Sequence, residues 1–157
     1  ERPGISIIHD DARVFLRGTD RTYDLVYLDV FDHLLTVPWT MVTTEALRDM
    51  AARLGPNGVF AANVLSPQSG SGTEFLARFR ATLEGVFPVS RLYLTDPTAD
   101  PYATQNLIVL ASNDVSALPD LGEAQTTVLA GGRPFTDMWA PVEYLQAKVF
   151  VQGLRWR

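Results

Sequence analysis

The chain has 157 residues and a formal net charge of −5, with 46% hydrophobic and 20% charged residues. This is enough for one domain with a hydrophobic core, and the balance is typical of a globular protein. The acidic net charge and the scattered basic residues argue against nucleic acid or an anionic membrane as the main partner. The chain has no cysteine, which excludes disulfides, thiolate catalysis and cysteine-bound metals. No run is long and apolar enough to span a bilayer, so the sequence predicts a cytoplasmic protein.

The first half of the chain alternates short apolar runs with amphipathic segments. ISIIH at residues 5–9 predicts a strand, and DDARVFLRG at residues 10–18 predicts a helix with an acidic start. YDLVYLDV at residues 23–30 has almost no polar alternation, which suits a parallel strand covered on both faces. The clearest helix begins at Thr43 or Thr44 and is stopped by GPNG at residues 55–58.

The second half predicts three further strands, two of which form a hairpin, and three helices. Residues 59–65 predict a strand and residues 73–87 a helix. The strands predicted at 89–96 and 106–112 are joined by a loop too short for a crossover helix, so they should form an antiparallel hairpin. The tail predicts a weak helix at 114–121 and a final helix at 142–154. This order of elements predicts an open α/β sheet and a single domain over residues 1–157.

Polar side chains follow the first three predicted strands. Asp10 and Asp11 come after the first, Asp29 and Asp32 after the second, and Asn63 ends the third. Open α/β sheets bind ligands beyond the carboxyl ends of their strands. A carboxylate at such a partly dry edge can hold an ammonium group or take a proton from it. Aspartate is also a common helix cap and turn residue, so a purely structural interpretation stays open for both pairs.

The histidines and serines of the chain do not indicate a metal site or a hydrolase site. His9 and His33 have no partners at metal-ligand spacing. Ser66 and Ser69 have no adjacent base and no nucleophile-elbow pattern. Asp137 is a further loop carboxylate that can be either functional or structural.

Taken together, these motifs resemble the second half of the spermidine synthase family. Its members are polyamine aminopropyltransferases built on the class I methyltransferase fold. The tail is most similar to the bacterial spermidine synthase-like proteins. The stretches that carry the resemblance are IIHDDARVFL, YDLVYLDVFD with the VP that follows, VTTEALRDMAARLGPNGVFAANV, NLIVLAS and FTDMWAPVEYL.

The resemblance implies a Rossmann-like sheet that is mostly parallel and ends in an antiparallel hairpin. It implies that the first two strands of the family are missing, with the Gly-rich loop and the acidic residue that hold the nucleoside. Residues 1–157 would then be the C-terminal part of a larger domain.

The resemblance also implies roles for five residues. Asp29 matches the first aspartate of the family's Asp-Ser-Ser-Asp motif and would deprotonate the attacking amine. Asp32 matches the second and would bind the amine. Asp11 and Ala12 match the Asp-Gly pair that meets the adenine, and Pro38 falls near a proline beside the adenine.

The activity implied is transfer of an aminopropyl group from decarboxylated S-adenosylmethionine to a polyamine such as putrescine, without a metal. Val30 and Phe31 depart from the small hydroxyl residues that the family has between its two aspartates. Two alternatives therefore stay open: an S-adenosylmethionine-dependent methyltransferase of the same fold, and a truncated, non-catalytic domain. A sheet without two of its strands would expose apolar edges, which predicts self-association into a homo-oligomer.

Overall fold

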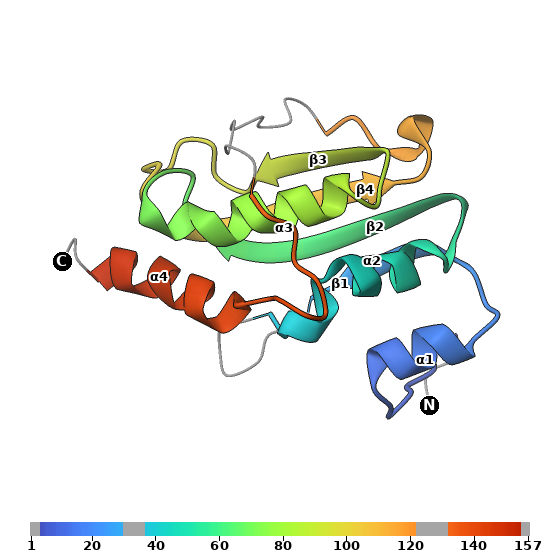
Figure 1. Ribbon diagram of the computed structural model, residues 1–157. Coiled ribbons are helices and arrows are strands. Elements are labelled where there is room, and N and C mark those ends of the chain that lie inside the picture. Colours follow the sequence, from blue (N-terminus) through green and yellow to red (C-terminus); the bar gives the residue numbers. More distant parts are fainter. Residues whose placement is uncertain (1–3, 30–36, 122–131, 155–157) are drawn as a thin grey trace.

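The computed structural model describes residues 4–29, 37–121 and 132–154 of the chain (Figure 1). No helix in these ranges is long and apolar enough to cross a membrane. The elements are, in chain order, α1 (Ala12–Gly18), β1 (Tyr23–Leu28), the 3-10 turn η1 (Trp39–Met41), α2 (Thr44–Ala51), β2 (Leu54–Ser66), η2 (Ser71–Thr73), α3 (Glu74–Glu84), β3 (Val89–Leu94), β4 (Gln105–Ser112), η3 (Val115–Ala117) and α4 (Val142–Leu154).

The four described strands form one sheet in the order β1-β2-β4-β3. Strand β1 pairs with β2 in parallel, whereas β4 lies between β2 and β3 and runs antiparallel to both. The α/β class and the C-terminal hairpin are thus confirmed. The expected predominance of parallel strands does not hold for these four. The hairpin inserts β4 beside β2, so it contributes two antiparallel pairings rather than one.

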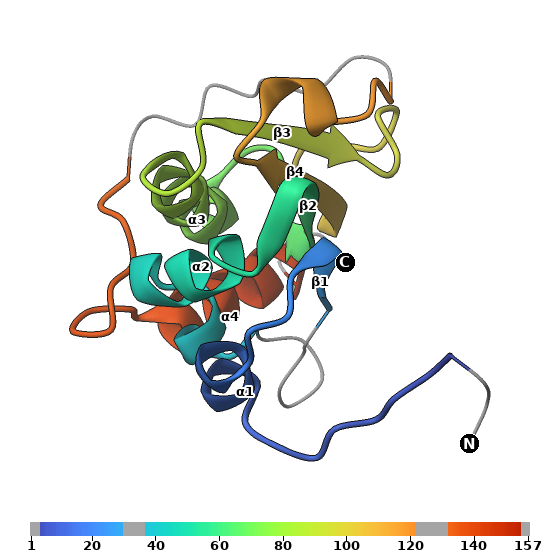
Figure 2. The same cartoon turned by 90° about the vertical axis from the view of Figure 1, so that its right-hand side faces the viewer.

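The strand predicted at residues 5–9 is wrong: this segment is extended but unpaired. Its side chains are exposed, including Ile7 at 78%. Figure 2 shows the segment running away from the body of the molecule. A strand is held by backbone hydrogen bonds to a neighbour, and the described residues provide none here. Its apolar composition alone is therefore not enough to form the strand.

Two smaller expectations are also corrected. The GPNG sequence at 55–58 lies inside β2, where the register with β1 shifts between Tyr23 and Leu25. A Cβ on Gly58 would lie 2.8 Å from the carbonyl oxygen of Tyr23, so this bulge requires glycine. The weak helix predicted at 114–121 is only the turn η3, whose N-cap is Asp114.

Helices α2, α3 and α4 cover one face of the sheet (Figure 2). The main core lies between them and the strands, and it is built around stacked phenylalanines such as Phe60 and Phe87, whose ring centroids are 5.6 Å apart. The periodicity of α2 and α3 accounts for this, because their buried residues fall on one side of each helix.

The opposite face of the sheet is covered unevenly. Leu118, just after η3, packs there against Ala61, Tyr93 and Leu110. On β1, the alternate residues Leu25 and Tyr27 point to this face and remain 57% and 53% exposed. The side of the sheet formed by β1 is therefore open on this face, next to the carboxyl end where Asp29 lies.

Candidate functional site at the carboxyl end of β1

Asp29 and Asn63 meet where β1 ends beside β2. Leu28 pairs with Ala62 in the parallel register, which brings the next residues of both strands together. The side-chain amide of Asn63 donates a hydrogen bond to Oδ1 of Asp29 over 3.2 Å. Asp29 is exposed, but the side-chain carbonyl oxygen of Asn63 is buried and accepts no hydrogen bond from the described part of the chain. Strand β2 continues to Ser66, so Asn63 lies inside this strand rather than at its end.

Tyr27 is the second side chain near Asp29. It lies in β1, two residues before Asp29, which directly follows the strand. The pKa of the Tyr27 hydroxyl is raised by loss of surrounding water, by the negative charge of Asp29 and by a hydrogen bond to that carboxylate. The phenol therefore stays protonated at neutral pH.

Asp11 caps the helix α1. Its Oδ1 accepts hydrogen bonds from the backbone N–H groups of Arg13 and Val14 at 2.9 and 3.0 Å. Neither bond uses Oδ2, and the side chain is exposed. Ala12 is the first residue of the helix and is also exposed. An open hollow of about 420 Å³ runs along α1 and is lined by Ile8, Asp10, Val14, Phe15, Gly18, Thr19 and Arg21.

Arg13 joins α1 to the C-terminal segment. Its two terminal nitrogens each donate to an oxygen of Asp137 at 2.9 Å, and it lies 3.5 Å from Asp49. Thr43 donates to the same Asp137 carboxylate at 2.6 Å. The hydrogen bonds with Arg13 hold the pKa of Asp137 below its usual value, and the same contact raises the pKa of Arg13. Asp137 therefore has a structural role, which is one of its two predicted interpretations.

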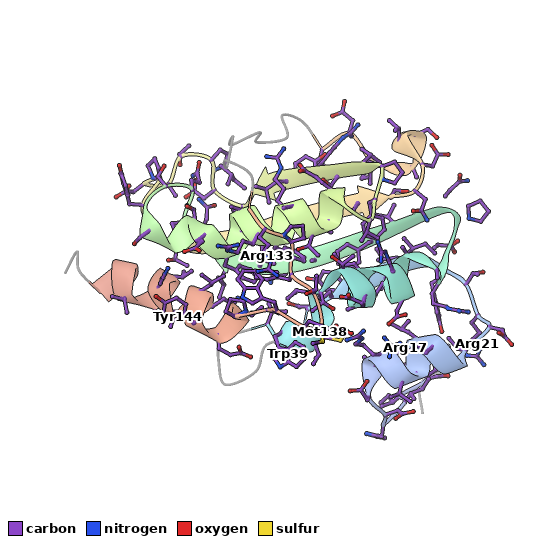
Figure 3. All side chains as sticks on the ribbon, in the orientation of Figure 1. Arg17, Arg21, Trp39, Arg133, Met138 and Tyr144 are labelled. Carbon is purple, nitrogen blue, oxygen red and sulfur yellow. The ribbon has the colours of Figure 1, made fainter. Side chains whose placement is uncertain are left out.

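Arg17 adds a second link between α1 and α2. Its Nε donates to Asp49 at 2.8 Å (Figure 3). Arg17 and Arg13 thus share one carboxylate of α2. Together with the Asp137 contact, these ion pairs hold α1, and hence Asp11, in place relative to the helical layer.

Pro38 is fixed by its neighbours. The backbone N–H of Val37 donates to the buried Oε1 of Gln146 in α4 at 2.9 Å. The carbonyl of Pro38 accepts from the N–H of Met41 at 2.9 Å and so begins η1. The side-chain nitrogen of Gln146 is buried, and no residue in the described ranges accepts a hydrogen bond from it.

The tryptophans near η1 and the C-terminal loop form part of the packing. Trp139 has the guanidinium groups of Arg78 and Arg133 at 4.9 and 4.4 Å from its ring centroid. Trp39 and the exposed Met138 lie next to each other (Figure 3) and border a hollow of about 260 Å³. Cationic side chains thus already contact the Trp139 ring.

The structure brings the predicted candidates into two groups. Asp29 lies with Asn63 at the carboxyl end of β1, whereas Asp11 and Ala12 begin α1. Asp32 lies outside the described residues. Within the described part of the chain, no group of histidine, cysteine, aspartate and glutamate residues could hold a metal ion.

The contributions of Tyr27 and Arg13 were not predicted. The position of Tyr27, two residues before Asp29, is a signal that could have indicated their proximity. The pairing of Arg13 with Asp137 spans 124 residues, and no local pattern predicts it.

The chain resembles enzymes of polyamine synthesis in sequence. No family model matches it. A polyamine aminopropyltransferase from Moorella thermoacetica is 32% identical over 102 residues, which are 59% of this chain and 35% of that protein. The chain therefore matches only about a third of the length of this curated relative.

Solved structures show the same fold. A probable spermidine synthase from Corynebacterium glutamicum has a TM-score of 0.63 and 19% identity, over 95% of this chain and 53% of that chain. A spermidine synthase in complex with the transition-state analogue AdoDATO has a TM-score of 0.53 and 19% identity, over 96% of this chain and 46% of that one. Human methyltransferase-like protein 13 in complex with SAH has a TM-score of 0.50 and 22% identity, over 96% and 59%. The resemblance to spermidine synthases and to the methyltransferase fold is thus confirmed.

Proposed function

We propose that this chain carries the amine-activating part of a spermidine synthase-like aminopropyltransferase. The reaction would move an aminopropyl group from decarboxylated S-adenosylmethionine to a polyamine such as putrescine. The observation that carries the proposal is the pairing of Asp29 with Asn63 at the carboxyl end of β1. An ammonium group has three hydrogen-bond donors, and this corner offers a carboxylate and an amide oxygen to which no described residue donates.

The reaction needs alignment and a base. The amine nitrogen attacks the methylene carbon bonded to the sulfonium sulfur, so a C–N bond forms and the C–S bond breaks. The electron pair of the C–S bond stays on sulfur, and a neutral thioether leaves. Asp29 takes the proton that the amine must lose. The protein also holds the amine in line with the carbon, which turns a bimolecular encounter into an oriented step.

The remaining roles are part of the same proposal. Asp32 would bind the amine beside Asp29. Asp11 and Ala12 would meet the adenine, with Oδ2 of Asp11 accepting from its exocyclic amine while Oδ1 caps the helix. Pro38 would lie beside the same ring. The AdoDATO complex of a spermidine synthase with this fold supports a sulfonium nucleoside as the co-substrate.

The first experiment is a calorimetric titration of the 157-residue chain with decarboxylated S-adenosylmethionine and, separately, with S-adenosylmethionine. Saturable binding that prefers the decarboxylated donor supports aminopropyl transfer. If neither compound binds, the chain does not by itself form the donor site and the proposal fails for it.

The site is tested by replacing Asp29 with asparagine in a transfer assay. Loss of a general base should lower kcat by roughly 10²- to 10⁴-fold. Asp24→Asn is the matched control, because Asp24 is an exposed aspartate at the other end of the same strand. Equal rates for the Asp29→Asn variant and the wild type would show that Asp29 is not the base.

Methyl transfer is the alternative function. Val30 and Phe31 replace the small hydroxyl residues expected next to the catalytic aspartate. The fold is also shared with a human methyltransferase-like protein in complex with SAH. Tighter binding of S-adenosylmethionine than of its decarboxylated form would favour this alternative.

We also propose that residues 1–157 form the C-terminal part of a larger domain and that the chain self-associates. The matched structures extend well beyond the region that aligns with this chain, which supports the first point. The exposed Leu25 and Tyr27 beside the outer edge of β1 support the second. A cytoplasmic location stays a prediction from the sequence.

A further inference from the structure

A glutamine amide lies in the apolar core where α4 meets the segment that leads into η1. Gln146 is 1% exposed, and Leu145 and Val149 of the same helix are also buried. The Oε1 atom of Gln146 accepts the backbone N–H of Val37 at 2.9 Å, across 109 positions of the chain. Val37 is itself buried, so water does not compete for this N–H group.

Packing alone does not account for a glutamine at this position. The side-chain nitrogen of Gln146 has no acceptor within the described ranges. Burial of an amide donor without an acceptor costs stability, whereas an unbranched apolar side chain such as methionine would fill the same space without that cost. The contribution that needs an amide is the oxygen that fixes the N–H of Val37.

The bond to Gln146 fixes the residue directly before Pro38, which is one of the proposed site residues. Pro38 is also held on its other side, because its carbonyl accepts from the N–H of Met41 at 2.9 Å. The ring of a proline locks its own φ angle, so these two backbone bonds set where the ring lies. Pro38 is only partly buried, which leaves surface on which a flat ring can pack.

We propose that Gln146 is a positioning residue that sets the place of Pro38 and thereby the affinity for the nucleoside part of the donor. It acts through Val37 and Pro38 and not by contact with the nucleoside. The helix that carries it is tied to α3, because Nζ of Lys148 donates to Glu74 at 2.7 Å. The effect on the nucleoside rests on the proposed function, whereas the bond between Gln146 and Val37 does not.

Amide hydrogen exchange of the 157-residue chain, followed by NMR, tests the bond without any substrate. The Val37 amide should exchange slowly in the wild type and roughly tenfold faster in Gln146→Met, which removes the acceptor and keeps an unbranched side chain. The Leu47 amide, which donates to Thr43 within α2, is the control and should exchange equally in both proteins. Fast exchange of the Val37 amide in the wild type, or equal exchange in both proteins, overturns the inference.

The effect on the nucleoside is tested in a transfer assay with varied donor and varied amine. Gln146→Met should raise the KM for decarboxylated S-adenosylmethionine roughly three- to tenfold, about the effect of one hydrogen bond, and leave the amine KM unchanged. Gln146→Glu keeps an oxygen that can accept from Val37, so it should return the donor KM toward the wild-type value. An unchanged donor KM in Gln146→Met would show that Gln146 does not position the nucleoside site.

Val149→Ala separates positioning from a general loss of packing, because Val149 is buried about one turn further along α4. This variant should lower the stability of the protein without raising the donor KM. An equal rise of the donor KM in Val149→Ala and Gln146→Met would contradict the positioning role. If the wild type transfers nothing, the proposed function fails, while the exchange of the Val37 amide still decides whether Gln146 holds this segment.

Discussion

The side-chain amide of Asn63 donates a hydrogen bond to the carboxylate of Asp29 across two parallel strands. The two residues are 34 positions apart in the chain and meet only because β1 and β2 pair in this register. The buried oxygen of the same amide accepts no hydrogen bond from the residues that the structure describes. In the proposed reaction the ammonium of the substrate would supply this donor, since buried acceptors are normally satisfied.

The first prediction concerns this amide. Asn63→Ala should raise the KM for the amine roughly three- to tenfold, because one hydrogen bond to the ammonium and one to Asp29 are lost. The measurement is a transfer assay at varied polyamine concentration. Asn106→Ala is the control, because Asn106 is an exposed asparagine on β4. A change in donor KM with an unchanged amine KM would place Asn63 on the nucleoside side instead.

Local patterns predicted most of the helical layer and the position of strand β1. The expectation that this strand is covered on both faces is wrong, because Leu25 and Tyr27 are 57% and 53% exposed. The cap at Thr43, the helix α2 and the strand β1 can each be predicted from residues that are close together in the sequence. Asp11 shows the limit of such patterns, because the cap it forms is visible in the sequence and an adenine contact is not. A helix cap and the proposed adenine contact would use the same residue type at the same position.

Pairing over long distances could not be predicted in this way. Residues 5–9 have the composition of a strand but lack a partner, so no strand forms among the described residues. The sequence leaves the role of Asp137 open between function and structure. Its hydrogen bonds with Arg13, from the other end of the chain, show the structural role. The composition of a segment shows which side chains it can bury, whereas its partners in space decide whether it forms a strand or an ion pair.

The second prediction concerns the ion pair that ties α1 to the C-terminal segment. Arg13→Met should lower the free energy of unfolding by about 2 kcal/mol, because it leaves the partly buried carboxylate of Asp137 without its guanidinium, whereas Asp49 keeps Arg17. Urea unfolding at pH 7 measures this. Arg48→Met, at an exposed position of α2, should change stability by less than about 0.5 kcal/mol. Equal effects of the two changes on the free energy of unfolding would mean that the ion pair of Arg13 does not stabilise the protein.

The third prediction is the pH dependence of the same pair. The pKa of Asp137 is lower in the folded protein than its usual value, so the unfolded chain binds the proton more readily. Its contribution is therefore complete above the usual aspartate range and is lost as the pH falls through the folded pKa. Asp137→Asn should destabilise the protein at pH 7 and have a smaller effect at pH 3. Asp20→Asn, at an exposed position before β1, is the control and should have little effect at either pH. A larger loss at pH 3 than at pH 7 for Asp137→Asn would contradict the assigned direction.

The last prediction concerns self-association through the open side of the sheet. Leu25 is 57% exposed on β1, and the described residues place no strand against the outer edge of β1. A lysine on an edge strand opposes pairing with a second chain, because the ammonium would have to be desolvated. Leu25→Lys should therefore shift sedimentation profiles toward the monomer at concentrations where the wild type associates. Val115→Lys is the matched control, since Val115 is 62% exposed on η3, away from this edge. Equal dissociation by both variants would reflect added charge alone, and a wild type that stays monomeric at every concentration would disprove the association.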